Sequence, residues 1–395
     1  MAELSKKIIT FLIFVYFVVF IFGQIPGFIF NLEYPHLPTL HLADAVVVLI
    51  WVLTLLNFHA FYTKFKLKKY IFTLIVILVF SQIISVAVNA GLYIPGLLYL
   101  VRFIAYINMI AVSRTIFSSK PKKTLLLQSL LTISVAIALL GWVQYVAIPD
   151  LTTLRLLMWD DHYYRLVSTF LDPTFTGILL VFGVIISVNF WTTTKKSLYI
   201  PITLLLLISL GFTYSRSSFL ALFLALVYMI CRRVKGRNIL YALLILMVSA
   251  SSILLLPRGS GGEGVRLERV ASIMLKIENS HQAIEVFSQQ PLFGVGYNNI
   301  CSINTGKMIN EIYSHSCSGF DNGLLMILAS TGIIGTLSFG ALGLALWSRS
   351  THDIYGEIWK ATIIAMGTHS LFTNTLFYAW VMGWVFLLSG IAAKK

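Results

Sequence analysis

The chain has 395 residues, of which 58% are apolar and only 11% are charged, and its formal net charge is +14. Because its mean hydropathy of +0.87 is far above what a soluble core requires, the composition excludes a soluble protein and predicts one that crosses a membrane repeatedly. The positive charge does not indicate nucleic-acid binding, since most Lys and Arg residues lie in short clusters between apolar runs.

Long apolar runs follow one another along the chain, mostly with short connections. They predict an all-α fold: a polytopic transmembrane helical bundle of about 12 spans, with one large, partly helical loop that faces outward. The first run is followed by no small-residue cleavage site, so we interpret it as a retained span and not as a signal peptide. The expected spans are 8–29, 42–58, 70–90, 95–113, 124–147, 174–191, 197–213, 218–231, 238–256, 323–347, 358–371 and 376–393.

The predicted organisation has four segments. When both termini are placed in the cytoplasm, most Lys and Arg residues fall in cytoplasmic connections, as the positive-inside rule requires. The polar loops 148–172 and 257–322 then lie on the outer side. The segments are 1–147 with about five N-terminal spans, 148–256 with the central spans and the loop 148–172, 257–322 as the large outer loop, and 323–395 with the C-terminal spans.

Of the arginines on the predicted outer side, which all run against the positive-inside bias, four are candidates for binding an anion. They are Arg165, Arg216, Arg266 and Arg269. Such residues suggest an anionic partner, because a guanidinium stays charged in a low dielectric and matches the oxygens of phosphate or pyrophosphate. Two alternatives stay open: Arg216 can snorkel to lipid headgroups, and Arg266 and Arg269 can be exposed charges that flank Glu268.

Candidate proton acceptors lie at the end of the large loop, close to the start of the next span. Asp321 or His315 can take a proton from a substrate hydroxyl. The structural alternative is that Asp321 and Asn322 cap the following helix and that His315 is a solvated loop residue.

Two further features lie near these residues. The segment Pro291–Asn298 has two glycines two residues apart, but it lacks the third glycine and the preceding strand of a dinucleotide-binding fingerprint. We interpret it as a tight turn that packs an aromatic residue, Tyr297, against the bundle. His369 and Asn374, both near the outer end of an expected span, can line the cavity that contains Asp321.

Two groups of potential ligands and thiols give weaker signals. The adjacent residues Asp160, Asp161 and His162 resemble metal ligands, but neighbours on one loop are weak evidence, so we expect a solvated loop and no metal site. Cys301 and Cys317 can form a disulfide if their loop faces an oxidising compartment, or they can be unpaired thiols.

Four short motifs follow one another between about residues 160 and 340. They are Arg165-Leu-Val-Ser-Thr-Phe-Leu-Asp-Pro173, Thr213-Tyr-Ser-Arg-Ser217, Pro291-Leu-Phe-Gly-Val-Gly296, and Asp321-Asn322 separated by nine residues from Gly332-Ile-Ile-Gly335. In this order they resemble the motifs of the O-antigen ligase and polymerase superfamily. The ligase branch has a histidine where this chain has Asp321, and His315 is out of register. This departure favours the Wzy-type polymerase branch.

The resemblance implies a bacterial inner-membrane glycosyltransferase that polymerises undecaprenyl-pyrophosphate-linked oligosaccharide repeat units into O-antigen or a related surface polysaccharide, within lipopolysaccharide biosynthesis. An acceptor hydroxyl attacks the anomeric carbon of the donor, the configuration inverts, and the lipid pyrophosphate leaves. No metal or other cofactor takes part. Donor and acceptor are lipid-linked glycans in the membrane, nucleic acid has no role, and a chain-length regulator protein can be a partner. Both termini are cytoplasmic, and the active site faces the periplasm.

In this reaction the four arginines stabilise the pyrophosphate as charge develops on it. Asp321 or His315 deprotonates the acceptor hydroxyl. Asn322, Tyr297 and His369 are expected to line the substrate cavity.

Two other functions stay open. One is an O-antigen ligase, which transfers the glycan from undecaprenyl pyrophosphate to lipid A-core. The other belongs to a different class: a transporter or flippase for lipid-linked oligosaccharides. It predicts repeat symmetry and charged residues inside the spans, where only Arg102 clearly lies.

Overall fold

The computed structural model describes residues 2–33, 41–63, 65–88, 94–157, 162–232, 271–300 and 319–394. These residues form α-helices and two short 3-10 helices without any strand, which confirms the predicted all-α fold. Six of the described helices are long and apolar enough to cross a membrane, and three shorter ones are also apolar. The protein is therefore a polytopic α-helical membrane protein.

The helices follow the apolar runs of the sequence. They are α1 (Ala2–Ile21), α2 (Ile25–Glu33), α3 (Leu42–Leu56), α4 (Phe58–Tyr62), α5 (Lys68–Val88), α6 (Ile94–Ile107), α7 (Met109–Ile116), α8 (Lys120–Ala147), α9 (Pro173–Thr194), α10 (Tyr199–Thr213), α11 (Arg216–Arg232), α13 (Ala271–Gln289), α15 (Gly323–Ser348), α16 (Ile354–Ser370) and α17 (Ala379–Ala392). Every expected span except 238–256 coincides with a described helix or helix pair. That span lies outside the described residues, so the number of crossings stays a prediction.

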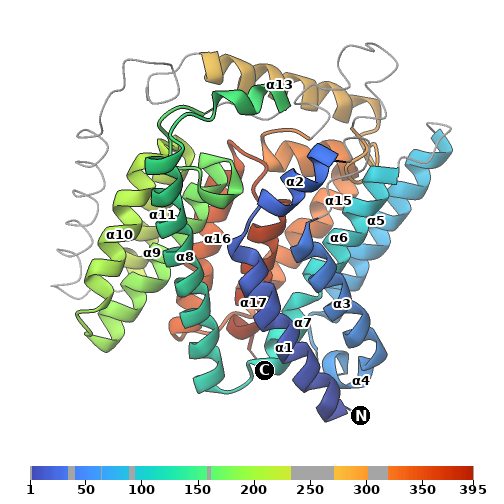
Figure 1. Ribbon diagram of the computed structural model, residues 1–395. Helices are drawn as coiled ribbons and strands as arrows, with labels where there is room; N and C mark the ends of the chain where they lie inside the picture. The colour runs from blue at the N-terminus through green and yellow to red at the C-terminus, as the bar shows by residue number, and fades with distance from the viewer. Residues whose placement is uncertain are drawn as a thin grey trace.

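Both chain termini lie at one end of the bundle, and α13 lies across the other end (Figure 1). Since α13 falls within residues 257–322, the large loop is partly helical, as predicted. Termini on the same side agree with the even number of crossings that the sequence predicts. Which end faces the cytoplasm, and the division into four segments, stay predictions.

Two helices form the centre of the bundle. Every residue of α9 from Thr176 to Phe190 is buried, and so is every residue of α17. Their sequences are apolar on all sides, as expected for helices surrounded by protein. α9 packs against α8, α10, α11 and α16, whereas α17 packs against α6, α7 and α16. Exposed apolar side chains concentrate on surrounding helices such as α1 and α5, where lipid would contact them.

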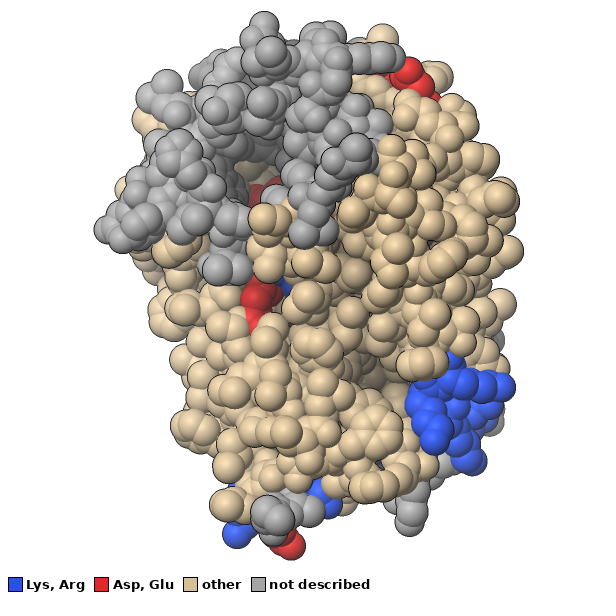
Figure 2. All heavy atoms as spheres, turned by 90° about the vertical axis from the view of Figure 1, so that its right-hand side faces the viewer, with Lys and Arg blue, Asp and Glu red and all other residues tan. Residues whose placement is uncertain are grey.

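Charged side chains are unevenly distributed over the surface. Figure 2 shows Lys and Arg gathered low on one face of the molecule, below a broad band of mostly uncharged residues. The low end of this view is the end at which both termini lie in Figure 1. Exposed lysines at helix starts include Lys66, Lys68 and Lys69 near the start of α5 and Lys120 and Lys122 in α8. Clusters of this kind beside the spans are what the positive-inside rule describes.

Candidate functional site

A cavity of about 720 Å³ lies between α13 and the neighbouring ends of α9, α11, α15 and α16. Because α13 crosses the end of the bundle opposite the termini, the cavity lies at that end (Figure 1). Its wall combines apolar side chains with ionic ones. The charged and titratable side chains in the wall are Arg165, Arg216, Lys276, Asp172, Asp321, His162 and His281.

The loop before α9 folds back on itself and so reaches the cavity. The Leu151 N–H donates to the His162 carbonyl oxygen at 2.8 Å. The Thr152 hydroxyl and N–H donate to the carboxylate of Asp150, and these hydrogen bonds lower the pKa of that group. The loop closed in this way brings His162 and Arg165 to the cavity wall.

Arg165 is a buried arginine held against the end of α10. Its side chain is 7% exposed, and its Nε donates to the Thr213 carbonyl oxygen at 3.0 Å. The adjacent Leu166 N–H donates to the Phe212 carbonyl oxygen at 2.9 Å. These bonds bring the two predicted phosphate-binding residues that the structure describes, Arg165 and Arg216, to the same cavity.

Arg216 is presented by the short turn between α10 and α11. Tyr214 in this turn has a left-handed backbone with a φ of +52°, a region in which bulky residues are uncommon. The chain reverses direction there, and Arg216 begins α11 immediately afterwards. Ser215, Arg216 and Ser217 all line the cavity as a result.

Asp321 forms an ion pair with Lys276 of α13, with 3.2 Å between Oδ2 and Nζ. Lys276 Nζ also donates to the Phe372 carbonyl oxygen at 2.6 Å. The Asp321 N–H donates to Asn279 Oδ1 at 2.8 Å. These contacts link α13, the start of α15 and the turn after α16, and they place a carboxylate beside a cation in the cavity wall.

Of the two residues that could cap α15, Asn322 is the one that does so. Its side-chain oxygen accepts hydrogen bonds from the N–H groups of Leu324 at 3.0 Å and Leu325 at 3.1 Å. The Asp321 carboxylate pairs with Lys276 instead. Capping therefore explains Asn322 but does not explain the presence of Asp321, although both residues line the cavity.

One face of α13 contributes to the cavity wall. Residues on this face are three or four positions apart, the spacing that places side chains on one side of a helix. This spacing was the signal that could have identified Lys276 and His281, which sequence reasoning did not assign to the site. Asp172, which caps α9, was not assigned either. The α13 residues in the wall are Ile273, Lys276, Ile277, Ser280, His281 and Ile284.

Several predicted site residues lie outside the described part of the chain. Arg266, Arg269 and His315 are among them, so their proposed roles stay predictions. The potential ligands Asp160 and Asp161 and the cysteines Cys301 and Cys317 also lie outside it. Within the described residues, no group of three or more His, Cys, Asp or Glu side chains could hold a metal ion.

His369, at the end of α16, is not among the residues of the cavity wall. Its side chain is fully buried. Nε2 lies 3.1 Å from Ser218 Oγ, and Nδ1 lies 2.6 Å from Thr375 Oγ1. One connection to the cavity wall runs through Ser218 to Ser215, whose hydroxyl oxygens are 2.8 Å apart, and another is the hydrogen bond of the ring to the backbone of Thr174.

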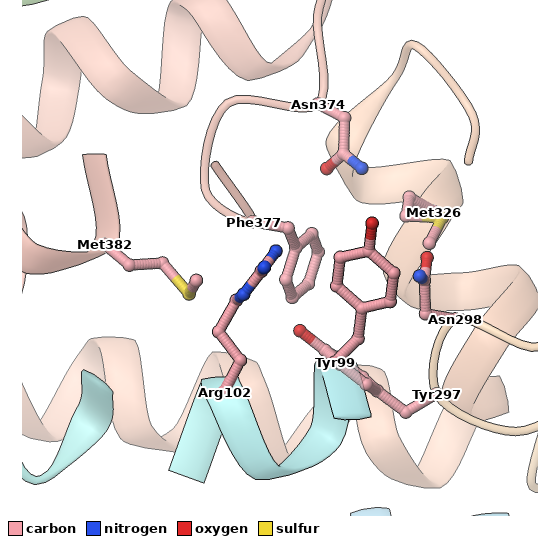
Figure 3. A pocket seen from close by; sticks show the side chains of 8 residues that line it. All are labelled: Tyr99, Arg102, Tyr297, Asn298, Met326, Asn374, Phe377 and Met382. Carbon is pink, nitrogen blue, oxygen red and sulfur yellow. The ribbon is translucent and has the colours of Figure 1, made fainter. Parts of the chain in front are cut away.

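Tyr297 lines a second, smaller cavity of about 50 Å³. Figure 3 shows Tyr99 and Arg102 projecting into it from α6, with Asn374 on the opposite side. The ring of Tyr297 is buried against that of Phe103, with 5.6 Å between centroids. Tyr297 therefore packs against the bundle, as the turn in the sequence indicates, and Asn374 shares its cavity rather than the larger one.

Arg102, the charge predicted inside a span, is paired with an acidic residue of α3. One terminal nitrogen of its guanidinium lies 2.5 Å from Asp44 Oδ2. The Tyr106 hydroxyl donates to the other carboxylate oxygen at 3.1 Å. The two charges neutralise each other inside the bundle, where removal of either partner would leave a buried charge.

The motif segment Pro291–Gly296 packs directly against the kink of α15. Gly332, at the kink, has a φ of +64° and a ψ of −169°, and Gly294 has a φ of +66°. A Cβ at Gly294 would lie 2.6 Å from the nitrogen of Gly332, and a Cβ at Gly332 would lie 2.6 Å from the nitrogen of Phe293. Two of the recognised motifs thus meet backbone to backbone, which requires glycine on both sides.

Hydroxyl groups of α5 hold the same segment from the other side. Ser81 Oγ donates to the Phe293 carbonyl oxygen at 2.6 Å, and Ser85 Oγ donates to the Val295 carbonyl oxygen at 2.5 Å. A helix in the first part of the chain, which the motifs do not cover, therefore helps to hold the segment Pro291–Gly296 in position.

The fold and the larger cavity together define a polytopic α-helical membrane protein with a cavity at one end of its bundle that is lined by both basic and acidic side chains. Residues 201–340 match the protein-family model described as O-antigen ligase. This match supports the O-antigen ligase superfamily and a role in glycan processing at the membrane. No curated protein matches the chain. The matched residues include Arg216 and Asp321 but neither Arg165 nor His369.

Proposed function

We propose that the protein is a bacterial inner-membrane glycosyltransferase that joins undecaprenyl-pyrophosphate-linked repeat units into O-antigen or a related surface polysaccharide. One observation carries the proposal: Arg165, Arg216 and the ion pair of Lys276 with Asp321 meet in one cavity at the end of a membrane bundle. Cations suit the pyrophosphate of the donor, and the carboxylate suits proton transfer from the acceptor.

The leaving pyrophosphate binds to Arg165 and Arg216 in this proposal. Negative charge develops on its bridging oxygen as the glycosidic bond breaks, and guanidinium groups fixed in advance stabilise that charge. Arg165 is well suited to this role because the hydrogen bond to Thr213 holds its Nε in place. The lipid chain next to the pyrophosphate contacts apolar residues of the wall, such as Leu220 and Ile277.

Asp321 acts as the general base in this proposal. Its partner Lys276 has contacts with both Asp321 and the Phe372 carbonyl oxygen. When the donor binds, its pyrophosphate competes for the ammonium group of Lys276, and the carboxylate is released to accept the proton of the acceptor hydroxyl. That oxygen then bonds to the anomeric carbon as the pyrophosphate leaves from the opposite side, which inverts the configuration. Arg266, Arg269 and His315 are further candidates for charge stabilisation and proton transfer.

The polymerase proposal is favoured over the ligase by Asp321, which stands where the ligase branch has histidine. The second candidate is an O-antigen ligase that transfers the glycan to lipid A-core, and the description of the matching family favours it. Both reactions use the same donor and differ in the acceptor. A chain-length regulator protein is a partner only in the polymerase proposal.

The proposed orientation has both termini in the cytoplasm and the cavity in the periplasm. It is supported by the common end at which the termini lie and by the exposed lysines near the starts of α5 and α8. Lipid-linked repeat units are assembled into polymer at that outer surface in the implied pathway, so the cavity is proposed to open towards them.

The test uses purified full-length protein and lipid-linked repeat units extracted from a strain that lacks it. Lengthening of these glycans without any lipid A-core supports the polymerase, and no lengthening unless lipid A-core is added supports the ligase. The deletion strain gives an independent measurement on a lipopolysaccharide gel. A single repeat on the core indicates a missing polymerase, whereas bare core with polymer on the undecaprenyl carrier indicates a missing ligase.

A further inference from the structure

The turn that presents Arg216 has a strained backbone. Tyr214 lies in the left-handed region, with a φ of +52° and a ψ of +29°. A bulky residue persists there only when surrounding contacts hold it. Ser215 follows, and Arg216 then starts α11. The direction of the Arg216 side chain at the cavity therefore depends on the contacts that hold these residues.

A chain of hydrogen bonds connects this turn to His369 of α16. Ser215 Oγ lies 2.8 Å from Ser218 Oγ, and Ser218 Oγ lies 3.1 Å from Nε2 of the histidine. On the other side of the ring, Nδ1 lies 2.6 Å from Thr375 Oγ1, whose hydroxyl donates to the Thr373 carbonyl oxygen at 2.9 Å. The chain thus joins the start of α11 to the end of α16 and the turn after it.

The packing around these hydrogen-bonded side chains holds them in place. Ser218 and His369 are fully buried, and Ser215 is 3% exposed. A Cβ at Gly177 of α9 would lie 2.9 Å from Ser218 Cβ and would overlap the Ser218 hydroxyl, so only glycine permits this approach. Helices α9, α11 and α16 all pack against one another. A hydroxyl confined in this way transmits the position of the histidine ring to the turn.

We assign His369 no direct contact with a substrate, because its ring is bonded to two hydroxyl groups and to the backbone of Thr174 and lies outside the cavity wall. We propose that His369 is a positioning residue of the pyrophosphate site: through Ser218 and Ser215 it fixes the direction of Arg216. This inference rests on the proposed role of Arg216 in binding the lipid pyrophosphate.

The first test measures binding of farnesyl pyrophosphate to the purified full-length protein in detergent. His369→Leu removes the hydrogen bonds of the ring to Ser218, to Thr375 and to the backbone of Thr174. We expect Kd to rise about tenfold, as for the loss of ~1.4 kcal/mol of binding energy. His369→Gln retains a donor and an acceptor, so its Kd is expected to stay within about threefold of wild type. Ser218→Ala is a smaller change that breaks the chain at its centre, and it is expected to resemble His369→Leu.

Ser187→Ala is the matched control for Ser218→Ala. Ser187 is a fully buried serine of α9, its Oγ lies 2.8 Å from Thr203 Oγ1, and it is not part of the cavity wall. Its substitution removes a comparable buried hydroxyl, so the wild-type Kd is expected. Equal Kd values for the two variants would mean that the hydrogen bonds from Ser215 to His369 contribute only ordinary packing. This result would overturn the positioning role.

A second test separates positioning from a general loss of stability. Arg216→Lys replaces the planar guanidinium, whose direction matters, with an ammonium group. Adding His369→Leu to this variant is therefore expected to raise Kd by less than about twofold. If His369→Leu raises Kd by the same factor in the Arg216→Lys variant as in wild type, the proposal is overturned. If wild-type protein does not bind the probe, the pyrophosphate site fails and this inference fails with it. If wild type binds the probe and His369→Leu binds it equally well, only the positioning role fails.

Discussion

Replacing Gly332 by alanine tests whether the large loop is held against α15 by direct backbone contact. The φ of +64° and ψ of −169° at this position lie in a region essentially restricted to glycine, and alanine there costs about 1–3 kcal/mol. The new Cβ would also lie 2.6 Å from the nitrogen of Phe293 and would overlap the Leu292 carbonyl oxygen. Overpacking of this kind costs about 1–3 kcal/mol more. We therefore expect Gly332→Ala to destabilise the protein by about 2–6 kcal/mol in total.

The assay is thermal unfolding of the purified protein in detergent, followed by tryptophan fluorescence. Gly343→Ala is the matched control, because Gly343 lies on the same helix and a Cβ there would meet nothing within 4 Å. Its Tm is expected to equal or slightly exceed that of wild type, since alanine is the better helix former by about 0.5–1 kcal/mol. Equal Tm values for the two variants would refute the close contact between the Gly332 kink and the loop.

Two further predictions concern the transfer reaction. Arg216→Ala is expected to lower the rate of polymer formation about a hundredfold or more while the protein stays folded; Arg232→Ala, an exposed arginine at the other end of α11, is the control and should transfer normally. Wild-type polymer levels from Arg216→Ala would remove it from the pyrophosphate site. Asp321→Asn is expected to impair transfer more than His315→Ala, because only the former removes the carboxylate beside Lys276. The reverse order, measured with both variants at equal expression, would assign the general base to His315.

The site brings together residues that the sequence separates widely. Lys276 lies in the first half of the large loop and Asp321 at its end, and Arg165 belongs to a different loop altogether. The sequence does not single out Lys276, because nothing around it resembles a motif. Only the packing of α13 across the bundle end makes it a neighbour of the carboxylate.

The motif glycines illustrate a different kind of prediction. A tight turn at Pro291–Gly296 can be predicted from its glycines, because a positive φ is a local property of the backbone. Its contact with Gly332 could not be predicted from the turn, since that contact depends on where a second segment passes.

Sequence alone determined the all-α membrane class and, for the described residues, the positions of the apolar helices. An apolar stretch of about 20 consecutive residues is enough to predict a helix that can cross a membrane, and it is recognised without knowledge of the fold. Only the tertiary structure decided which polar residues share a cavity, that Asn322 caps α15 while Asp321 pairs with Lys276, and that His369 is buried outside the cavity wall. Those outcomes depend on contacts between helices distant in sequence. Such contacts stabilise the protein only after the helices have packed together.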